Sequence, residues 1–254
     1  YLYTQRSTSA DAGSIAAGAL AGLGRRLLTA GNLPEAREVF RRALEHQPAH
    51  AASALGLAAI EETLGEYRAA VAVLRAWVEA PPTGGAPGET AELREGWLRL
   101  AVNLARTGAA DEAFAIYRRL VERRAAGGED WMAVVAYEEL ASGLAAAGRL
   151  GEAVELLGAA VERFPGEQRF YLHRAALLDR AGRVAEARQA LSVLYRRLTT
   201  ADTAADSPRY VYSDWPAVAF DRSRRTFGDQ VAERVPRLAE ALAAETGSVG
   251  EGSR

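Results

Sequence analysis

Residues 134–167, VVAYEELASGLAAAGRLGEAVELLGAAVERFPGE, contain the pattern of two amphipathic helices separated by a glycine. From Tyr137 to Leu144, apolar residues recur at i, i+3, i+4 and i+7, which places them on one face of a helix. Gly148 follows, and a glycine there can adopt the left-handed conformation that ends a helix. The apolar spacing then resumes over residues 153–164. This stretch therefore predicts two helices folded back on each other.

The same frame recurs five times along the chain. With residue 134 as position 1, position 15 is glycine in every repeat: Gly31, Gly65, Gly108, Gly148 and Gly182. Position 20 is alanine in every repeat (Ala36, Ala70, Ala113, Ala153, Ala187), and position 8 is glycine or alanine (Gly24, Ala58, Ala101, Ala141, Ala175). We expect positions 8 and 20 to lie where the two helices cross, because small side chains allow a close approach. The frame predicts five helix hairpins, at residues 17–50, 51–84, 94–127, 134–167 and 168–201.

Larger residues complete the pattern at three further positions. Position 4 is aromatic in Trp97, Tyr137 and Tyr171, position 24 is aromatic in Phe40 and Tyr117, and position 32 is proline in Pro48, Pro82 and Pro165. With its small residues and its period of about 34 residues, this pattern resembles the tetratricopeptide repeat (TPR). The resemblance covers residues 17–201. It implies an all-α, right-handed α-solenoid of about five TPR-like hairpins that serves as a non-catalytic protein–protein interaction scaffold.

The regions outside the frame carry separate predictions. Residues 1–16 comprise a lead-in, expected to be extended or poorly ordered up to residue 10, and the start of a helix capped by Asp11. We expect Ile15, Leu20, Leu23 and Leu27 to form the buried side of that helix. Nine extra residues separate the second and third repeats, around residues 81–88, which proline and glycine mark as a loop. That loop is either a plain extension or a partner contact. Asp130 is predicted to cap the lengthened helix of the fourth repeat.

Residues 202–254 comprise a linker, an aromatic segment and a tail that we expect to be disordered. The aromatic segment, residues 209–245, contains five aromatic side chains within its first half: Tyr210, Tyr212, Trp215, Phe220 and Phe227. The last repeat of a solenoid exposes an apolar face unless another element covers it. We therefore predict that this segment caps the array, with a ligand-binding patch as the alternative.

Composition argues against several other functions. The chain has 31 basic and 33 acidic residues, which gives no overall attraction to nucleic acid or to an anionic membrane. It contains no cysteine, no apolar stretch of transmembrane length and no catalytic motif. His46 and His50 have helical spacing but flank Pro48, so no metal site is predicted there. We predict no catalytic residues and no cofactor. The abundance of alanine and arginine without lysine indicates a bacterial genome, but the compartment, cytoplasmic or periplasmic, is not readable.

In proteins that resemble this chain, the first helices of the hairpins line a concave groove. Positions 2, 5, 9, 12 and 13 point into that groove, and the resemblance therefore implies a set of partner-binding candidates. The selected residues are Arg25, Leu55, Glu62, Leu98, Val102, Arg106, Glu138, Ser142, Arg169, Leu172, Asp179 and Arg180. Isolated charges of both signs among small and apolar residues suit an extended segment or a helix of a partner protein. The alternative is a docking or regulatory subunit of a larger enzyme or membrane complex, attached through its edges or its aromatic C-terminal segment.

Overall fold

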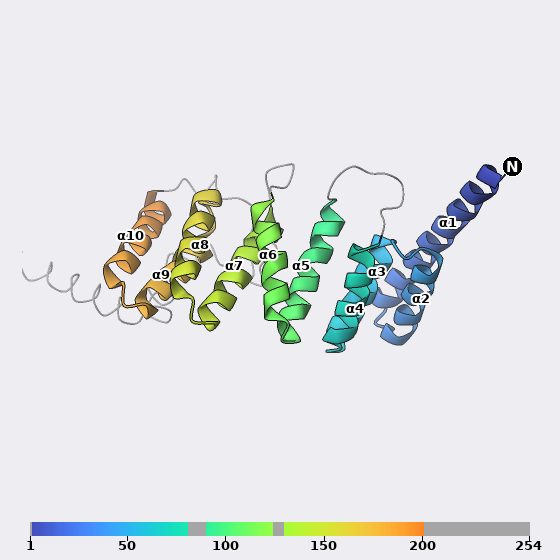
Figure 1. The fold of residues 1–254 in the computed structure, drawn as a ribbon, viewed down its shortest axis with the longest axis horizontal. Helices are drawn as coiled ribbons and strands as arrows, with labels where there is room; N and C mark the ends of the chain where they lie inside the picture. The colour runs from blue at the N-terminus through green and yellow to red at the C-terminus, as the bar shows by residue number, and fades with distance from the viewer. Residues whose placement is uncertain (1, 81–89, 124–129, 201–254) are drawn as a thin grey trace, which may run out of the picture. The chain divides into compact units, whose positions relative to one another are not determined.

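The computed structural model describes residues 2–80, 90–123 and 130–200, and these residues form helices joined by short turns (Figure 1). In chain order the helices are α1 (Leu2–Thr29), α2 (Leu33–His46), α3 (Ala51–Thr63), α4 (Tyr67–Val78), α5 (Ala91–Arg106), α6 (Ala110–Glu122), α7 (Trp131–Ala146), α8 (Leu150–Arg163), α9 (Gln168–Arg180) and α10 (Val184–Thr200). No strand occurs in these ranges. The described residues form five helix hairpins, as expected for the all-α solenoid class that the sequence predicts.

The hairpins belong to two compact units. Helices α1–α6 lie in the first unit and helices α7–α10 in the second. Within the first unit, α1 packs on α2, α3 on α4 and α5 on α6, and the second helix of one hairpin also contacts the first helix of the next. Within the second unit, α7 packs on α8, α9 packs on α10, and α8 contacts α9. Each unit is therefore built by one packing step that repeats along the chain.

The glycine at repeat position 15 ends the first helix of every hairpin. Gly31, Gly65, Gly108, Gly148 and Gly182 have φ values between 75° and 89°, and no other described residue has a positive φ. At Gly31 the amide donates to the carbonyl of Leu28, and the Asn32 amide donates to the carbonyl of Leu27. The other four turns repeat this pair of hydrogen bonds, which defines the Schellman motif. The predicted turn is confirmed in all five repeats.

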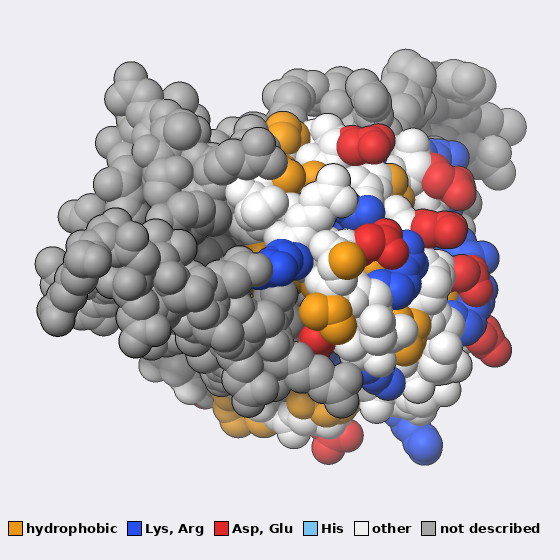
Figure 2. Space-filling model, turned by 90° about the vertical axis from the view of Figure 1, so that its left-hand side faces the viewer, with side chains coloured by type: hydrophobic (Ala, Val, Ile, Leu, Met, Phe, Trp, Pro, Cys, Tyr) orange, Lys and Arg blue, Asp and Glu red, His pale blue; other side chains and the backbone are white. Residues whose placement is uncertain are grey.

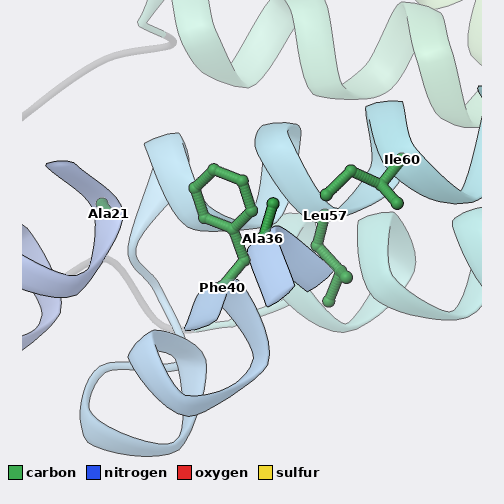
Figure 3. Close-up of a cluster of buried hydrophobic side chains, with 5 residues drawn as sticks. All are labelled: Ala21, Ala36, Phe40, Leu57 and Ile60. Atoms are coloured by element: carbon green, nitrogen blue, oxygen red, sulfur yellow. The ribbon is translucent and has the colours of Figure 1, made fainter. Parts of the chain in front are cut away.

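The small residues at positions 8 and 20 lie at the closest contact within each hairpin. The alanines at both positions are fully buried. At Gly24 a Cβ atom would come within 2.7 Å of the Phe40 ring, so only glycine fits there. Figure 3 shows Phe40 with Ala36 on α2, beside Leu57 and Ile60 on α3 and Ala21 on α1. The core of the first unit thus continues from one hairpin into the next.

The amino-terminal prediction was wrong. Helix α1 begins at Leu2, so residues 2–10 are helical and Asp11 lies inside the helix instead of capping it. Residues 2–10 contain no glycine or proline, so nothing in the sequence interrupts the helix before the repeat frame begins. The predicted buried side was wrong for two of its four residues, because Ile15 is 74% exposed and Leu23 is 39% exposed. Leu20 and Leu27 are half-buried, and Leu27 packs against the core cluster. Ala17, Ala21 and Gly24 are buried, and Gly24 lies against the Phe40 ring of α2.

At the start of α7, the prediction for Asp130 is confirmed. Its carboxylate accepts a hydrogen bond of 3.1 Å from the Ala133 amide and lies 3.2 Å from the Arg163 guanidinium. The predictions for the loop at residues 81–88, and for the linker, cap and tail at residues 202–254, lie outside the described residues. No helix in the described ranges has the length and apolar character needed to cross a membrane.

Candidate partner-binding faces

Six of the predicted groove residues lie on the first helices of the first unit. Arg25 on α1 and Arg106 on α5 are exposed, and Leu55 on α3 and Val102 on α5 are half-buried. Leu98 is only 4% exposed and belongs to the core, so its selection as a surface contact was wrong. The repeat position of a residue predicts the direction in which its side chain leaves its own helix. It does not predict how deeply the neighbouring helix buries that side chain.

Glu62, the sixth residue, forms part of a polar network between α3 and α5. The Arg99 guanidinium donates to both Glu62 carboxylate oxygens, at 2.7 Å to Oε2 and 3.3 Å to Oε1. The Asn103 amide donates to Glu62 Oε1 at 2.7 Å, and Arg99 also donates to the Leu55 carbonyl at 3.1 Å. The Glu62 carboxylate is therefore already bound by two side chains of the next repeat, and this network fixes α3 against α5.

The sequence analysis missed Arg99 and Asn103. They occupy repeat positions 6 and 10, which were not among the positions used to select groove residues. Their spacing of four residues on α5 was a usable signal, because two polar side chains one turn apart can bind the same carboxylate. Both side chains are largely buried, with Asn103 only 1% exposed.

Two other cations of the first unit also have internal neighbours. The Arg106 guanidinium lies over the Tyr67 ring of α4, 4.9 Å from the ring centroid. Arg25 lies near His50, which caps α3: Nδ1 of His50 accepts from the Ser53 amide at 3.3 Å. Burial, and then the positive charge of Arg25, lower the pKa of His50 below 6.5. The neutral imidazole that this favours can act as the cap acceptor.

The other six predicted residues lie on α7 and α9 of the second unit. Ser142 and Arg180 are exposed, and the Arg180 guanidinium donates to the Ala145 carbonyl at 3.4 Å. Arg169 lies 3.9 Å from Glu138 and 3.3 Å from Glu167. Two predicted groove residues of opposite charge, Glu138 on α7 and Arg169 on α9, therefore lie close together. Leu172 is only 7% exposed, so its predicted role as a surface anchor was wrong.

Asp179 is the most unusual of these residues. It is only 8% exposed, yet its Oδ1 atom accepts no hydrogen bond from the described residues. It occupies the same repeat position as Glu62, whose carboxylate receives donors from the following hairpin. In the second unit, no described residue takes the place of Arg99 and Asn103 beside Asp179. A buried carboxylate oxygen without a donor is destabilising by about 1–3 kcal/mol, so this position favours the binding of a hydrogen-bond donor.

The described part of the face drawn in Figure 2 shows no patch of a single charge sign. On the face drawn in Figure 2, basic and acidic side chains lie next to one another across the coloured area. In the described ranges, no three histidine, aspartate or glutamate side chains are close enough to hold a metal ion.

Comparisons with known proteins match this architecture. Tetratricopeptide repeat models match residues 22–85, 95–125 and 144–199, which together include parts of all five hairpins. The chain belongs to the tetratricopeptide repeat family. No curated protein sequence matches it significantly. Repeats of this family are typically non-catalytic scaffolds for protein–protein interaction, and membership supports an interaction scaffold at this general level.

Several solved TPR structures share the fold. MamA from Desulfovibrio magneticus RS-1 has a TM-score of 0.56 at 18% identity, covering 73% of this chain and 97% of that one. YrrB, described as a TPR protein with an unusual peptide-binding site, has a TM-score of 0.51 at 18% identity, covering 71% and 84%. The Pseudomonas aeruginosa pilF protein has a TM-score of 0.52 at 18% identity, covering 92% and 99%. At 18% identity, these similarities show a shared fold only.

Proposed function

We propose that this TPR chain binds a segment of a partner protein on the face formed by α7 and α9, with Asp179 as the central contact. The observation that carries the proposal is the buried Asp179 carboxylate, one oxygen of which accepts no hydrogen bond from the described residues. A partner that supplies an N–H donor would satisfy this oxygen. Because the oxygen itself is closed to solvent, the atoms that cover it have to shift to admit the donor. The gain is specific to a partner with a donor at that point, because an apolar group would leave the oxygen unsatisfied.

The residues around Asp179 define the chemistry of the partner. Arg180 follows it and is exposed, whereas Glu138 and Arg169 form an ion pair on the two helices. A segment with an arginine, a lysine or a free backbone amide facing Asp179, and with a carboxylate near Arg180, fits this arrangement of charges. Such contacts determine the register of a bound segment more than its total affinity. YrrB supports the proposal only in general terms, as a protein of similar fold whose description includes a peptide-binding site.

A displayed peptide library, selected on the full chain, tests the proposal. We expect the selected peptides to contain a basic residue, and Asp179→Asn to raise their Kd at least tenfold by calorimetry. Arg180→Glu should weaken binding less and make it less sensitive to salt, because the side chain is exposed and screened. The control Glu162→Gln removes a charge from the exposed side of α8 and should bind normally.

Melting curves of all variants must stay close to that of the wild type for the comparison to count. Wild-type affinity in Asp179→Asn, or loss of binding in Glu162→Gln, would place the contact elsewhere and contradict the proposal. The docking-subunit alternative assigns binding to the edges or to residues 209–245 instead. The apolar residues exposed on α1 favour an additional contact at one edge.

A further inference from the structure

Helix α1 has an outward face that no described residue covers. Its members lie at helical spacing along one side: Ile15, Gly18, Ala19, Gly22, Leu23 and Arg26. Ile15 is 74% exposed, and it is the most exposed large apolar residue in the described ranges. A Cβ atom added at Gly18 or at Gly22 would meet no atom within 4 Å. We name this set the outer face of α1. The exposed side chains of Ile15 and Leu23 form an apolar ridge on it, and the open spaces at Gly18 and Gly22 form two notches.

The later repeats show what this face does elsewhere in the fold. In the second repeat, Gly56 holds position 6, as Gly22 does in the first, and the Phe40 ring of the preceding hairpin fills the space beside it. Leu57 holds the position of Leu23 and is buried against the same cluster. In the third repeat the glycine is at position 3, the position of Ala19 in the first, and the Trp77 side chain of α4 fills the space beside this residue, Gly96. The outer face of α1 is therefore a helix-packing surface that no helix of the described residues covers.

The spacing of ridge and notch makes this face complementary to itself. When a second α1 lies antiparallel, with the twofold axis between Gly18 and Ala19, residue i faces residue 37 − i of the copy. Ile15 then lies opposite Gly22, and Gly18 lies opposite Ala19, so a large side chain meets a notch twice. In a parallel pair, Ile15 would face Ile15 and Gly22 would face Gly22, which leaves a clash and a gap.

We propose that two copies of this chain form an antiparallel dimer through the outer faces of α1. Such a contact is isologous, because each copy supplies the same ridge and the same notches. A single helix face buries less than the roughly 1,200 Å² of a standard interface. The dimer is therefore reversible, and its population depends on protein concentration. This surface lies in the first unit, apart from the face of α7 and α9 proposed for partner binding.

Sedimentation of the full chain over a hundredfold range of concentration tests the dimer. We expect a monomer–dimer equilibrium in the wild type, and Ile15→Glu should raise the dissociation constant at least tenfold. Leu64→Glu is the matched control, because Leu64 is also a large apolar residue, is 48% exposed, and lies at the end of α3 away from this face. It should dimerise as the wild type does. Circular dichroism should show the same helix content in all three proteins.

The absence of cysteine from the sequence allows a second test of geometry. Ala19→Cys lies beside the proposed twofold axis and should form an intermolecular disulfide under mild oxidation. In the antiparallel dimer of Arg26→Cys, the cysteine of one copy lies about 22 Å along the helix axis from the cysteine of the other, because the rise is 1.5 Å per residue. A disulfide requires Cα atoms within about 7 Å, so this variant should not cross-link. A parallel pair would cross-link at both positions.

Three outcomes would overturn the proposal. These are a monomer at every concentration, a dimer that Ile15→Glu leaves unchanged, and cross-linking of Arg26→Cys as fast as that of Ala19→Cys. None of them bears on peptide binding at Asp179, which is measured separately on the same variants.

Discussion

The network between α3 and α5 gives a quantitative prediction for the coupling of two hairpins. Replacing Glu62 by alanine removes the acceptor of two hydrogen bonds from Arg99 and one from Asn103. The side chains of Arg99 and Glu62 are 20% and 24% exposed, so the pair lies between a surface salt bridge and a fully buried one. Exposed pairs contribute about 0.2–1 kcal/mol, and removing one partner of a buried pair costs about 3–5 kcal/mol.

We therefore expect Glu62→Ala to lower the free energy of unfolding by about 2–3 kcal/mol. Arg99→Ala should cost a similar amount, because Arg99 also donates to the Leu55 carbonyl. The double variant should be less destabilised than the sum of the two, with a coupling energy of about 1–2 kcal/mol. Urea unfolding of the four proteins of the cycle, followed by circular dichroism, measures this coupling energy.

The exposed pair of Arg149 and Glu152 on α8 is the control. Its side chains are 42% and 53% exposed, and the two residues are adjacent on one turn of the helix. The same cycle there should give a coupling energy below about 0.5 kcal/mol. Equal coupling in the two cycles, or a value near zero between Glu62 and Arg99, would refute the argument that partial burial makes this network stabilising.

Two further predictions concern a turn and a cap. Gly148→Ala should lower stability by about 1–2 kcal/mol, because Gly148 has a φ of +78°, whereas Gly151→Ala, three residues later within α8 and in open space, should be neutral or raise stability by about 0.5–1 kcal/mol. Thermal melts of the two variants decide this, and equal destabilisation would contradict it. The pKa of His50 lies below 6.5 in the folded chain, so the unfolded chain binds more protons, and stability should fall as the pH drops below about 6.5. His50→Asn keeps a cap acceptor and should weaken this pH dependence, and an imidazole that titrates at or above 6.5 by NMR would show the reasoning to be wrong.

The sequence predicted the hairpins closely because their determinants are local and steric. Gly148 and Ala153 can be recognised from the sequence alone. A left-handed turn requires the glycine, and a close helix crossing requires the small alanine. The binding faces depend on residues distant in sequence, and there the prediction was weaker. Glu62 was selected as a free groove residue, but Arg99, 37 residues later, binds its carboxylate. Leu98 and Leu172 were selected by spacing alone, and the depth of burial follows from the packing of neighbouring helices.

Helix α1 shows a related limit of prediction from the sequence. Apolar spacing alone predicted that Ile15 and Leu23 would be buried, because it assumes that every apolar face has a neighbour. In the first repeat no described hairpin precedes α1, and its fully buried alanines, Ala17 and Ala21, are small. A periodic pattern identifies a face that can pack, and it does not indicate whether a partner helix is present.

The position of Phe40 restricts how this chain can evolve. Its ring occupies the space that a Cβ atom would need at both Gly24, in its own repeat, and Gly56, in the next. Trp77 has the same relation to Gly96. Deleting or exchanging the second repeat would therefore bring a large ring against a side chain, or leave a glycine without its ring. Although the five hairpins share one frame, recombination among the first three would have to keep these neighbouring repeats together to preserve both contacts.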